Sequence, residues 1–221
     1  MKTWNELQEG VYDPNIFKAF FLAGGPGSGK SYVVQRTTGG LGMKVVNSDT
    51  AFEKLLKDAN LSLKMPETET GPRDVVRAKA KALTKKRQQN YIEGRLGLII
   101  DGTGHDFEKI TKQARELENL GYDTHMIFVN TSLDVALERN QMRARSIPEK
   151  IVTQSWKDVQ KNIGKFSNFF KGNFIIVDHN DPNAPPHIEV FKRVRNLAKK
   201  KVQNTRAKAW IARELELKKR T

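Results

Sequence analysis

The feature that most constrains this chain is the segment FLAGGPGSGKS, which runs from Phe21 to Ser31. It matches the pattern G-x-x-x-x-G-K-[ST], in which glycines let backbone N–H groups approach phosphate oxygens, the lysine reaches the β- and γ-phosphates, and the hydroxyl helps to hold Mg²⁺. A glycine-rich hairpin turn would need glycine and polar residues, but not Gly-Lys-Ser at its end. The pattern therefore predicts a phosphate-binding loop. Its residues are Gly24, Gly25, Gly27, Ser28, Gly29, Lys30 and Ser31.

The segments around the loop predict the fold class. The apolar run Lys18–Ala23 is typical of a buried strand, and Ser31–Arg36 can begin a helix. Strand-like and helix-like segments then alternate, which predicts an α/β fold of the P-loop NTPase class, with a parallel sheet of about five strands flanked by helices. The expected strands are Lys18–Ala23, Met43–Asn47, Leu96–Asp101, Thr124–Asn130 and Phe174–Asp178. The expected helices are Thr50–Lys57, Asp74–Glu93, Asp106–Leu120 and Leu133–Arg143, followed by one that starts in the capping-box segment Ser146–Glu149, with Pro148 in its first turn.

Composition divides the chain into three parts. Residues 1–179 hold the alternating pattern, residues 180–187 (NDPNAPPH) form a proline-rich linker, and residues 188–221 form a basic helical extension. The net charge is +14, and the extension alone carries 12 Lys and Arg against 3 Glu. This excess favours a polyanionic partner such as nucleic acid, with Trp210 available to stack on a base. The alternative is a solvated helix that docks in part on the domain.

The composition also excludes some classes of protein. The 221 residues include no cysteine, which excludes a disulfide framework and a thiolate metal site. The first ten residues, MKTWNELQEG, lack the continuous apolar core of a signal peptide. No apolar stretch approaches the roughly 18 residues that span a bilayer. We therefore expect a cytoplasmic protein without a membrane partner.

Two aspartates follow predicted strands. Asp49 lies just past the second strand, and ligands of parallel sheets bind at the carboxyl ends of the strands. Its carboxylate can accept the proton of an incoming hydroxyl, although Ser48 or Asp49 can instead cap the next helix. Asp101 ends the apolar run in LIIDGTGH, where a carboxylate commonly orients Mg²⁺; an Asp-Gly turn is the alternative.

Arginines gather in the segment ERNQMRARSIPE, residues 138–149. Arg139, Arg143 and Arg145 lie at a predicted helix end and in the connection that follows it. A solvated basic surface is the ordinary explanation of such a run. Phosphoryl transfer, however, needs cations to neutralise the charge that spreads over the transferred group, and guanidinium groups bind phosphate oxygens at two points.

Four segments in this order resemble the motifs of P-loop kinases of the zeta-toxin and phage-type polynucleotide kinase group. They are Gly24–Ser31, Asn47–Asp49, Ile100–Thr103 and the series Arg139, Arg143 and Pro148. The resemblance covers about residues 18–178 and implies a kinase domain over residues 1–179. Such a kinase uses ATP and Mg²⁺ to phosphorylate a hydroxyl-bearing acceptor. The resemblance implies that Asp49 is the general base and that Lys30 binds the phosphates. It implies that Arg143 is the lid arginine and that Arg139 makes a second contact with a phosphate or with adenine. Ser31 and Asp101 would be the residues of the metal site.

The residues that would hold the phosphate acceptor differ from those of this kinase group. Polynucleotide kinases and many zeta toxins carry an arginine a few residues after the base to hold the acceptor, whereas this chain has Phe52, Glu53 and Lys54 there. The candidates to replace it are Lys54, Arg73 and Arg77. Acceptors to consider are a nucleic-acid 5′-hydroxyl, a nucleotide sugar and a smaller metabolite. The alternative function is a nucleotide-regulated P-loop NTPase that binds nucleic acid or protein without kinase activity.

Overall fold

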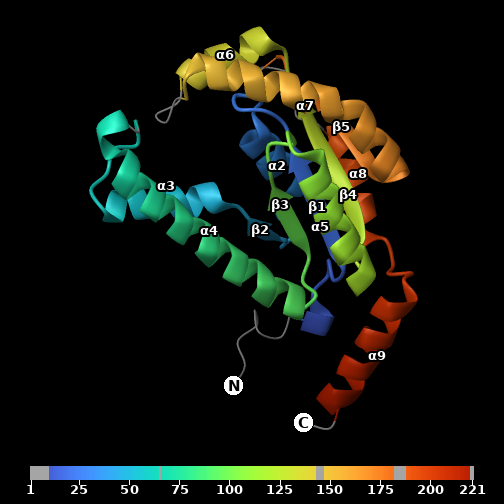
Figure 1. The fold of residues 1–221 in the computed structure, drawn as a ribbon. Coiled ribbons are helices and arrows are strands. Elements are labelled where there is room, and N and C mark those ends of the chain that lie inside the picture. Colours follow the sequence, from blue (N-terminus) through green and yellow to red (C-terminus); the bar gives the residue numbers. More distant parts are fainter. Residues whose placement is uncertain (1–9, 65, 143–146, 182–187, 220–221) are drawn as a thin grey trace.

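A parallel five-stranded sheet forms the centre of the protein (Figure 1). The structure is a computed structural model that describes residues 10–64, 66–142, 147–181 and 188–219. The strands are β1 (Lys18–Ala23), β2 (Lys44–Val46), β3 (Leu98–Asp101), β4 (Asp123–Asn130) and β5 (Phe174–Asp178). Their order is β2-β3-β1-β4-β5, and every hydrogen-bonded pair is parallel. The predicted fold class is confirmed.

Strand β1 lies at the centre of this sheet. Its residue Ala19 pairs with Leu98 of β3 on one side and with Thr124 of β4 on the other. All six of its residues are buried, because helices cover both faces of the sheet. A strand buried on both faces needs an almost continuous apolar sequence, which is why this segment was recognisable.

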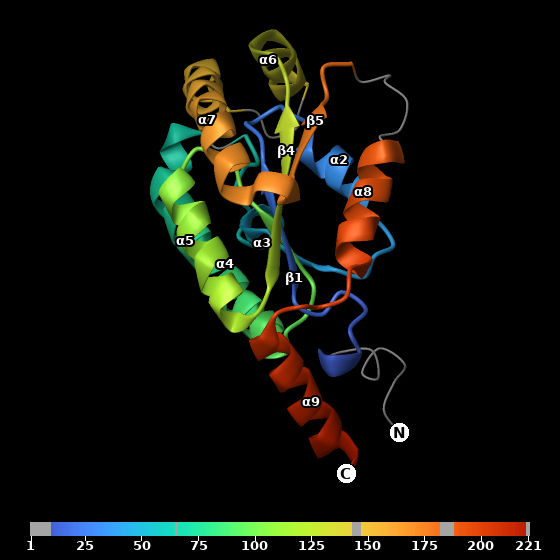
Figure 2. The same cartoon turned by 90° about the vertical axis from the view of Figure 1, so that its right-hand side faces the viewer.

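The helices form two layers around the sheet (Figure 2). On one face lie α2 (Lys30–Thr38) and α8 (Ile188–Lys199), and on the other lie α4 (Thr70–Glu93), α5 (Phe107–Leu120) and α7 (Glu149–Phe170). The remaining helices are α3 (Ser48–Asp58), α6 (Leu133–Gln141) and α9 (Thr205–Lys219), with the 3₁₀ turns η1 (Gly10–Tyr12), η2 (Glu67–Glu69) and η3 (Lys171–Asn173). Helix α6 lies at the carboxyl ends of the strands and α9 at their amino ends. No helix in the described ranges is long and apolar enough to cross a membrane.

Each face of the sheet has its own apolar core. Phe21 and Phe128 pack with Phe166 of α7 in one core, and Phe20 packs with Val33 of α2 in the other. A smaller cluster joins α3 to α4 through Phe52, Leu56 and Ala80. The sheet and its two helix layers thus hold the carboxyl ends of the strands in fixed positions.

The basic extension contributes to both large cores. Val194 and Ala198 of α8 are fully buried in the core on the α2 face, and Ala207 of α9 is buried in the other. The Trp210 ring meets the edge of Phe17 at 5.5 Å between centroids, and Arg95 lies over it. The Trp210 ring therefore packs against the protein itself, as in the alternative of a helix that docks in part on the domain.

Some element boundaries differ from the sequence predictions. Helix α7 begins at Glu149, and Pro148 is its N-cap rather than a first-turn residue; Ser146 lies outside the described residues. Helix α4 begins at Thr70 instead of Asp74, because proline is tolerated in a first helical turn and Pro72 therefore does not delay it. Helix α6 ends at Gln141, and Arg143 lies outside the described residues.

Candidate functional site

The predicted phosphate-binding loop joins β1 to α2 at the carboxyl edge of the sheet. Its residues Gly27 and Gly29 have φ values of 79° and 81°, in the left-handed region that favours glycine. A Cβ atom on Gly27 would lie 2.1 Å from the carbonyl oxygen of Ala136 in α6, and one on Gly29 would lie 2.4 Å from the ring of His179. Only glycine therefore fits where the loop passes between α6 and His179.

The loop also presents polar groups that a phosphate chain can use. The Ser28 hydroxyl is buried and has no hydrogen-bond partner among the described residues. The Lys30 ammonium group folds back over the loop and donates to the carbonyl oxygen of Gly24. Exposed Ser31 lies in the first turn of α2, where the helix dipole favours anions. The buried orphan hydroxyl and the glycine-only backbone fit a phosphate-binding cradle.

Helix α7 fixes the other side of this edge. The indole N–H of Trp156 donates to the carbonyl oxygen of Thr131, just past β4, at 2.8 Å. The amide of Asn162 donates to the carbonyl oxygen of His105, past β3, at 2.8 Å. One helix thus ties together the loops that follow β3 and β4, the two strands on either side of β1.

A single side chain connects the two candidate aspartates. Asn47 is the N-cap of α3, and its Oδ1 accepts the backbone N–H of Asp49 at 2.6 Å. Its Nδ2 donates to the carboxylate of Asp101 at 2.6 Å. The alternative that Ser48 or Asp49 caps the helix is therefore wrong. The carboxylate of Asp49 is left to make other contacts.

The surrounding protein shifts the pKa of the Asp101 carboxyl group. Burial raises the pKa of its carboxyl group above the ordinary value, the charge of Lys30 lowers this pKa, and the charge of Asp49 raises it. These effects require Lys30, Asp49 and Asp101 to lie within electrostatic range of one another. The structure therefore brings together three residues that are far apart in the sequence.

The carboxylate of Asp49 binds an arginine from another helix. Nη1 of Arg77, in α4, lies 2.7 Å from Oδ1 of Asp49, and its guanidinium group lies over the ring of Phe52. Of the three candidates for the acceptor side, Arg77 forms this ion pair with the aspartate, and Arg73 forms one with Asp74 at 4.0 Å. Helix α4 thus supplies a cation beside Asp49.

Arg139 lies on the opposite side of the phosphate-binding loop. Its Nη1 donates to the carbonyl oxygen of His179 at 2.7 Å and would lie 3.6 Å from a Cβ atom on Gly29. The His179 ring stacks on Tyr32 of α2 at 5.4 Å. Arg139 is therefore next to the loop, as its predicted role requires. That role stays a prediction, as do the roles of Arg143 and Arg145, which lie outside the described residues.

Comparison with known protein families identifies the class to which this site belongs. A family model described as zeta toxin matches residues 12–184, more than three quarters of the chain. The chain belongs to the zeta toxin family. The resemblance drawn from the sequence motifs is confirmed, and the loop, Asp49 and Asp101 all lie inside the matched region.

Solved structures show that this zeta toxin family member has the fold of P-loop kinases. A candidate kinase from Chloroflexus aurantiacus J-10-fl is 18% identical with a TM-score of 0.59, covering 81% of this chain and 97% of that one. The complex of AvrRxo1-ORF1 with AvrRxo1-ORF2 is 13% identical with a TM-score of 0.59, covering 88% of this chain and 79% of that one. At these identities the likeness shows the fold alone. A search of curated proteins finds no match.

Several residues of the zeta toxin site received no role from the sequence. Asn47 was recognised only as part of a motif, and His179 and Tyr32 were not singled out. An asparagine directly after a strand and before a helix is a usable signal for an N-cap. The contact of Asn47 with Asp101 spans 54 residues of sequence, and no local pattern predicts it.

Proposed function

We propose that this protein is a kinase that transfers the γ-phosphate of ATP to a hydroxyl group of an acceptor. The observation that carries the proposal is the arrangement around Asn47, which places Asp49 and Asp101 together at the mouth of the phosphate-binding loop. A protein that only binds and hydrolyses a nucleotide does not need a second carboxylate held by its own cation. The zeta toxin family and the P-loop kinase fold support a phosphotransferase.

In this proposal, Asp49 is the general base. The acceptor hydroxyl gives its proton to the Asp49 carboxylate as its oxygen forms a bond to the γ-phosphorus. The bond from that phosphorus to the β–γ bridging oxygen breaks, and ADP leaves with the electron pair. Arg77 orients the carboxylate at 2.7 Å and can contact the acceptor in place of the arginine that is missing after the base.

The remaining charged residues would act on the phosphates. Lys30 is the cation for the β- and γ-phosphates, Arg139 contacts ATP from the α6 side, and Arg143 is the lid arginine. Ser31 and Asp101 supply the oxygen ligands that Mg²⁺ prefers. When bound, the ion would neutralise charge on the phosphates.

The test is transfer of labelled phosphate from ATP to a panel of oligonucleotides, nucleotide sugars and nucleosides. We expect transfer to at least one class, and Asp49→Asn should lower the rate by about 10²-fold or more while ATP affinity stays nearly unchanged. Asp58→Asn is the matched control, because Asp58 is an exposed residue at the far end of the same helix. Full transfer by the Asp49 variant would remove the base from the mechanism. ATP hydrolysis without transfer to any acceptor would favour the nucleotide-regulated binding protein.

A further inference from the structure

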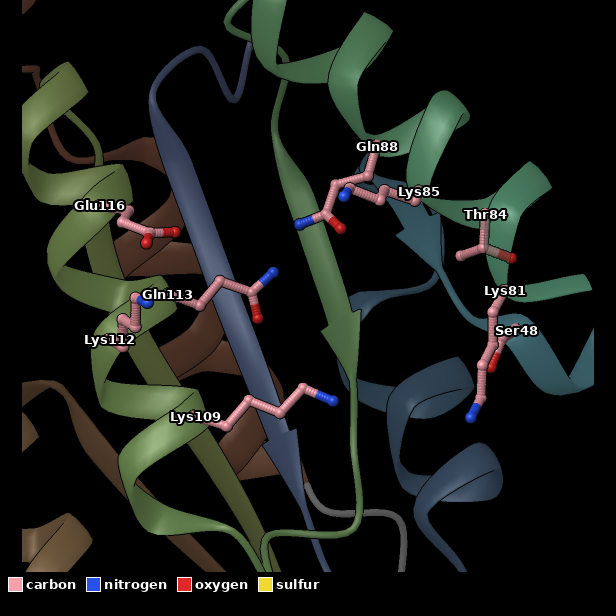
Figure 3. Close-up of a pocket in the computed structure, with 9 residues that line it drawn as sticks. All are labelled: Ser48, Lys81, Thr84, Lys85, Gln88, Lys109, Lys112, Gln113 and Glu116. Atoms are coloured by element: carbon pink, nitrogen blue, oxygen red, sulfur yellow. The ribbon is translucent and has the colours of Figure 1, made fainter. Parts of the chain in front are cut away.

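A groove rich in lysine lies between α4 and α5, over strand β3 (Figure 3). Its volume is about 560 Å³. Lys81 and Lys85 of α4 and Lys109 and Lys112 of α5 line its two walls. Among the described residues that line it, Glu116 alone is acidic, so the groove carries a strong positive charge.

The chemistry of the lining restricts what the groove can bind. Its other residues are hydroxyl and amide side chains, and none is aliphatic or aromatic. Sites for small organic ligands are lined mainly by apolar and aromatic side chains. A lining of lysine, hydroxyl and amide side chains suits an anion instead, and it offers no aromatic ring on which a base can stack.

Carboxylates in the described ranges form no ion pair with the four groove lysines. Lys85 and Lys109 extend from opposite walls toward β3 in Figure 3. Like charges that converge on one groove repel each other, and a bound anion would relieve this repulsion.

The cations follow a regular stripe that begins at the candidate base. Arg77, Lys81 and Lys85 are spaced four residues apart along α4, so they lie on one face of the helix, about 6 Å apart along its axis. Arg77 binds Asp49, and the neighbouring Ser48 lines the groove. Cations repeated along one line suit a ligand whose negative charges also repeat.

We propose that this groove binds the phosphate backbone of a single-stranded nucleic acid. The lysines lie on two walls of a groove of about 560 Å³, which a flexible single strand can enter more readily than a rigid duplex. Contacts to phosphates rather than to bases make the binding independent of sequence. The site is separate from the basic extension, because α9 lies at the amino ends of the strands and Ser48 at the carboxyl end of β2.

The binding is measured without ATP, so the result does not depend on phosphoryl transfer. Fluorescence anisotropy of a short labelled oligothymidylate is followed with the full chain as salt rises from roughly 50 to 200 mM. Each single-strand phosphate contact contributes about 0.7 to the slope of log affinity against log salt. We expect the variant Lys81→Gln/Lys85→Gln/Lys109→Gln to bind about tenfold or more weakly at low salt, with a slope lower by about 2.

The matched control is Lys79→Gln/Lys86→Gln, since both lysines are exposed on α4 and neither lines the groove. It should bind like the wild type, and an unlabelled duplex should compete less well than a single strand. Circular dichroism checks folding, and the single variants Lys81→Gln and Lys109→Gln, each expected to lower the slope by about 0.7, replace the triple variant if it unfolds. The proposal would be overturned if the groove variant and the wild type had the same salt slope. It would also be overturned if the control variant lost as much affinity as the groove variant, or if the duplex competed as well as the single strand.

Discussion

Replacing Asn47 by alanine tests whether one side chain positions both carboxylates. The Asn47 amide accepts the Asp49 N–H at 2.6 Å and donates to Asp101 at 2.6 Å. Loss of an N-cap costs about 1 kcal/mol. A hydrogen bond to a charged group contributes about 1.5 kcal/mol at the lower end of its range, which applies because Asn47 and Asp101 are both partly exposed. We expect Asn47→Ala to lower the free energy of unfolding by about 2.5 kcal/mol.

Asn47→Ser separates the two contributions, because serine keeps an acceptor for the cap but has no amide to reach Asp101. Its expected loss is about 1.5 kcal/mol. Asn47→Asp also keeps the cap but places a second carboxylate beside Asp101, so its loss should be larger at neutral pH than in acid. Urea unfolding followed by circular dichroism measures all three variants. An alanine variant within about 0.5 kcal/mol of the wild type, or a serine variant as unstable as the alanine one, would refute the reasoning.

Two further predictions concern stability. Burial, with a contribution from Lys18, lowers the pKa of His125 to about 4. The unfolded chain therefore binds a proton that the folded protein excludes. The contribution of His125 to stability should be complete above about pH 6.5, and the free energy of unfolding should fall by up to about 3 kcal/mol toward pH 4. Urea unfolding across this range should show a smaller loss for His125→Phe. Gly27→Ala should lose about 2 kcal/mol or more and bind ATP poorly by calorimetry, because its Cβ would lie 2.1 Å from a carbonyl oxygen. Gly164→Ala, in the interior of α7 with open space around it, should instead gain up to about 1 kcal/mol, and a loss there would contradict the glycine argument.

The sequence predicts well what depends on local patterns. The five strands were found because each is a short apolar run, and β1 and β5 have the predicted ends. The loop was found because its glycines and Lys30 are required at fixed spacing. The start of α9 also follows a local pattern, since the side chain of Asn204 accepts the N–H groups of Arg206 and Ala207 there.

Contacts between distant segments could not be predicted in this way. Arg77 was one of three candidates, and only the packing of α3 on α4 brings it to Asp49. The basic groove needs α4 and α5 side by side, so its lysines look like ordinary solvated charges in the sequence. Trp210 is the converse case, since the sequence left open whether this aromatic residue stacks on a base or docks on the domain, and its packing on Phe17 is visible only in the structure.

The packing of α9 on the amino end of the sheet has a consequence for how the protein is made. Phe17 directly precedes β1, whereas Ala207 and Trp210, which share its core, follow about 190 residues later in the chain. A chain still being translated would therefore hold an uncovered apolar surface beneath β1. Exposed surface of this kind makes partly folded chains prone to aggregate. The apolar core at the amino end of β1 can therefore be completed only after α9 has left the ribosome.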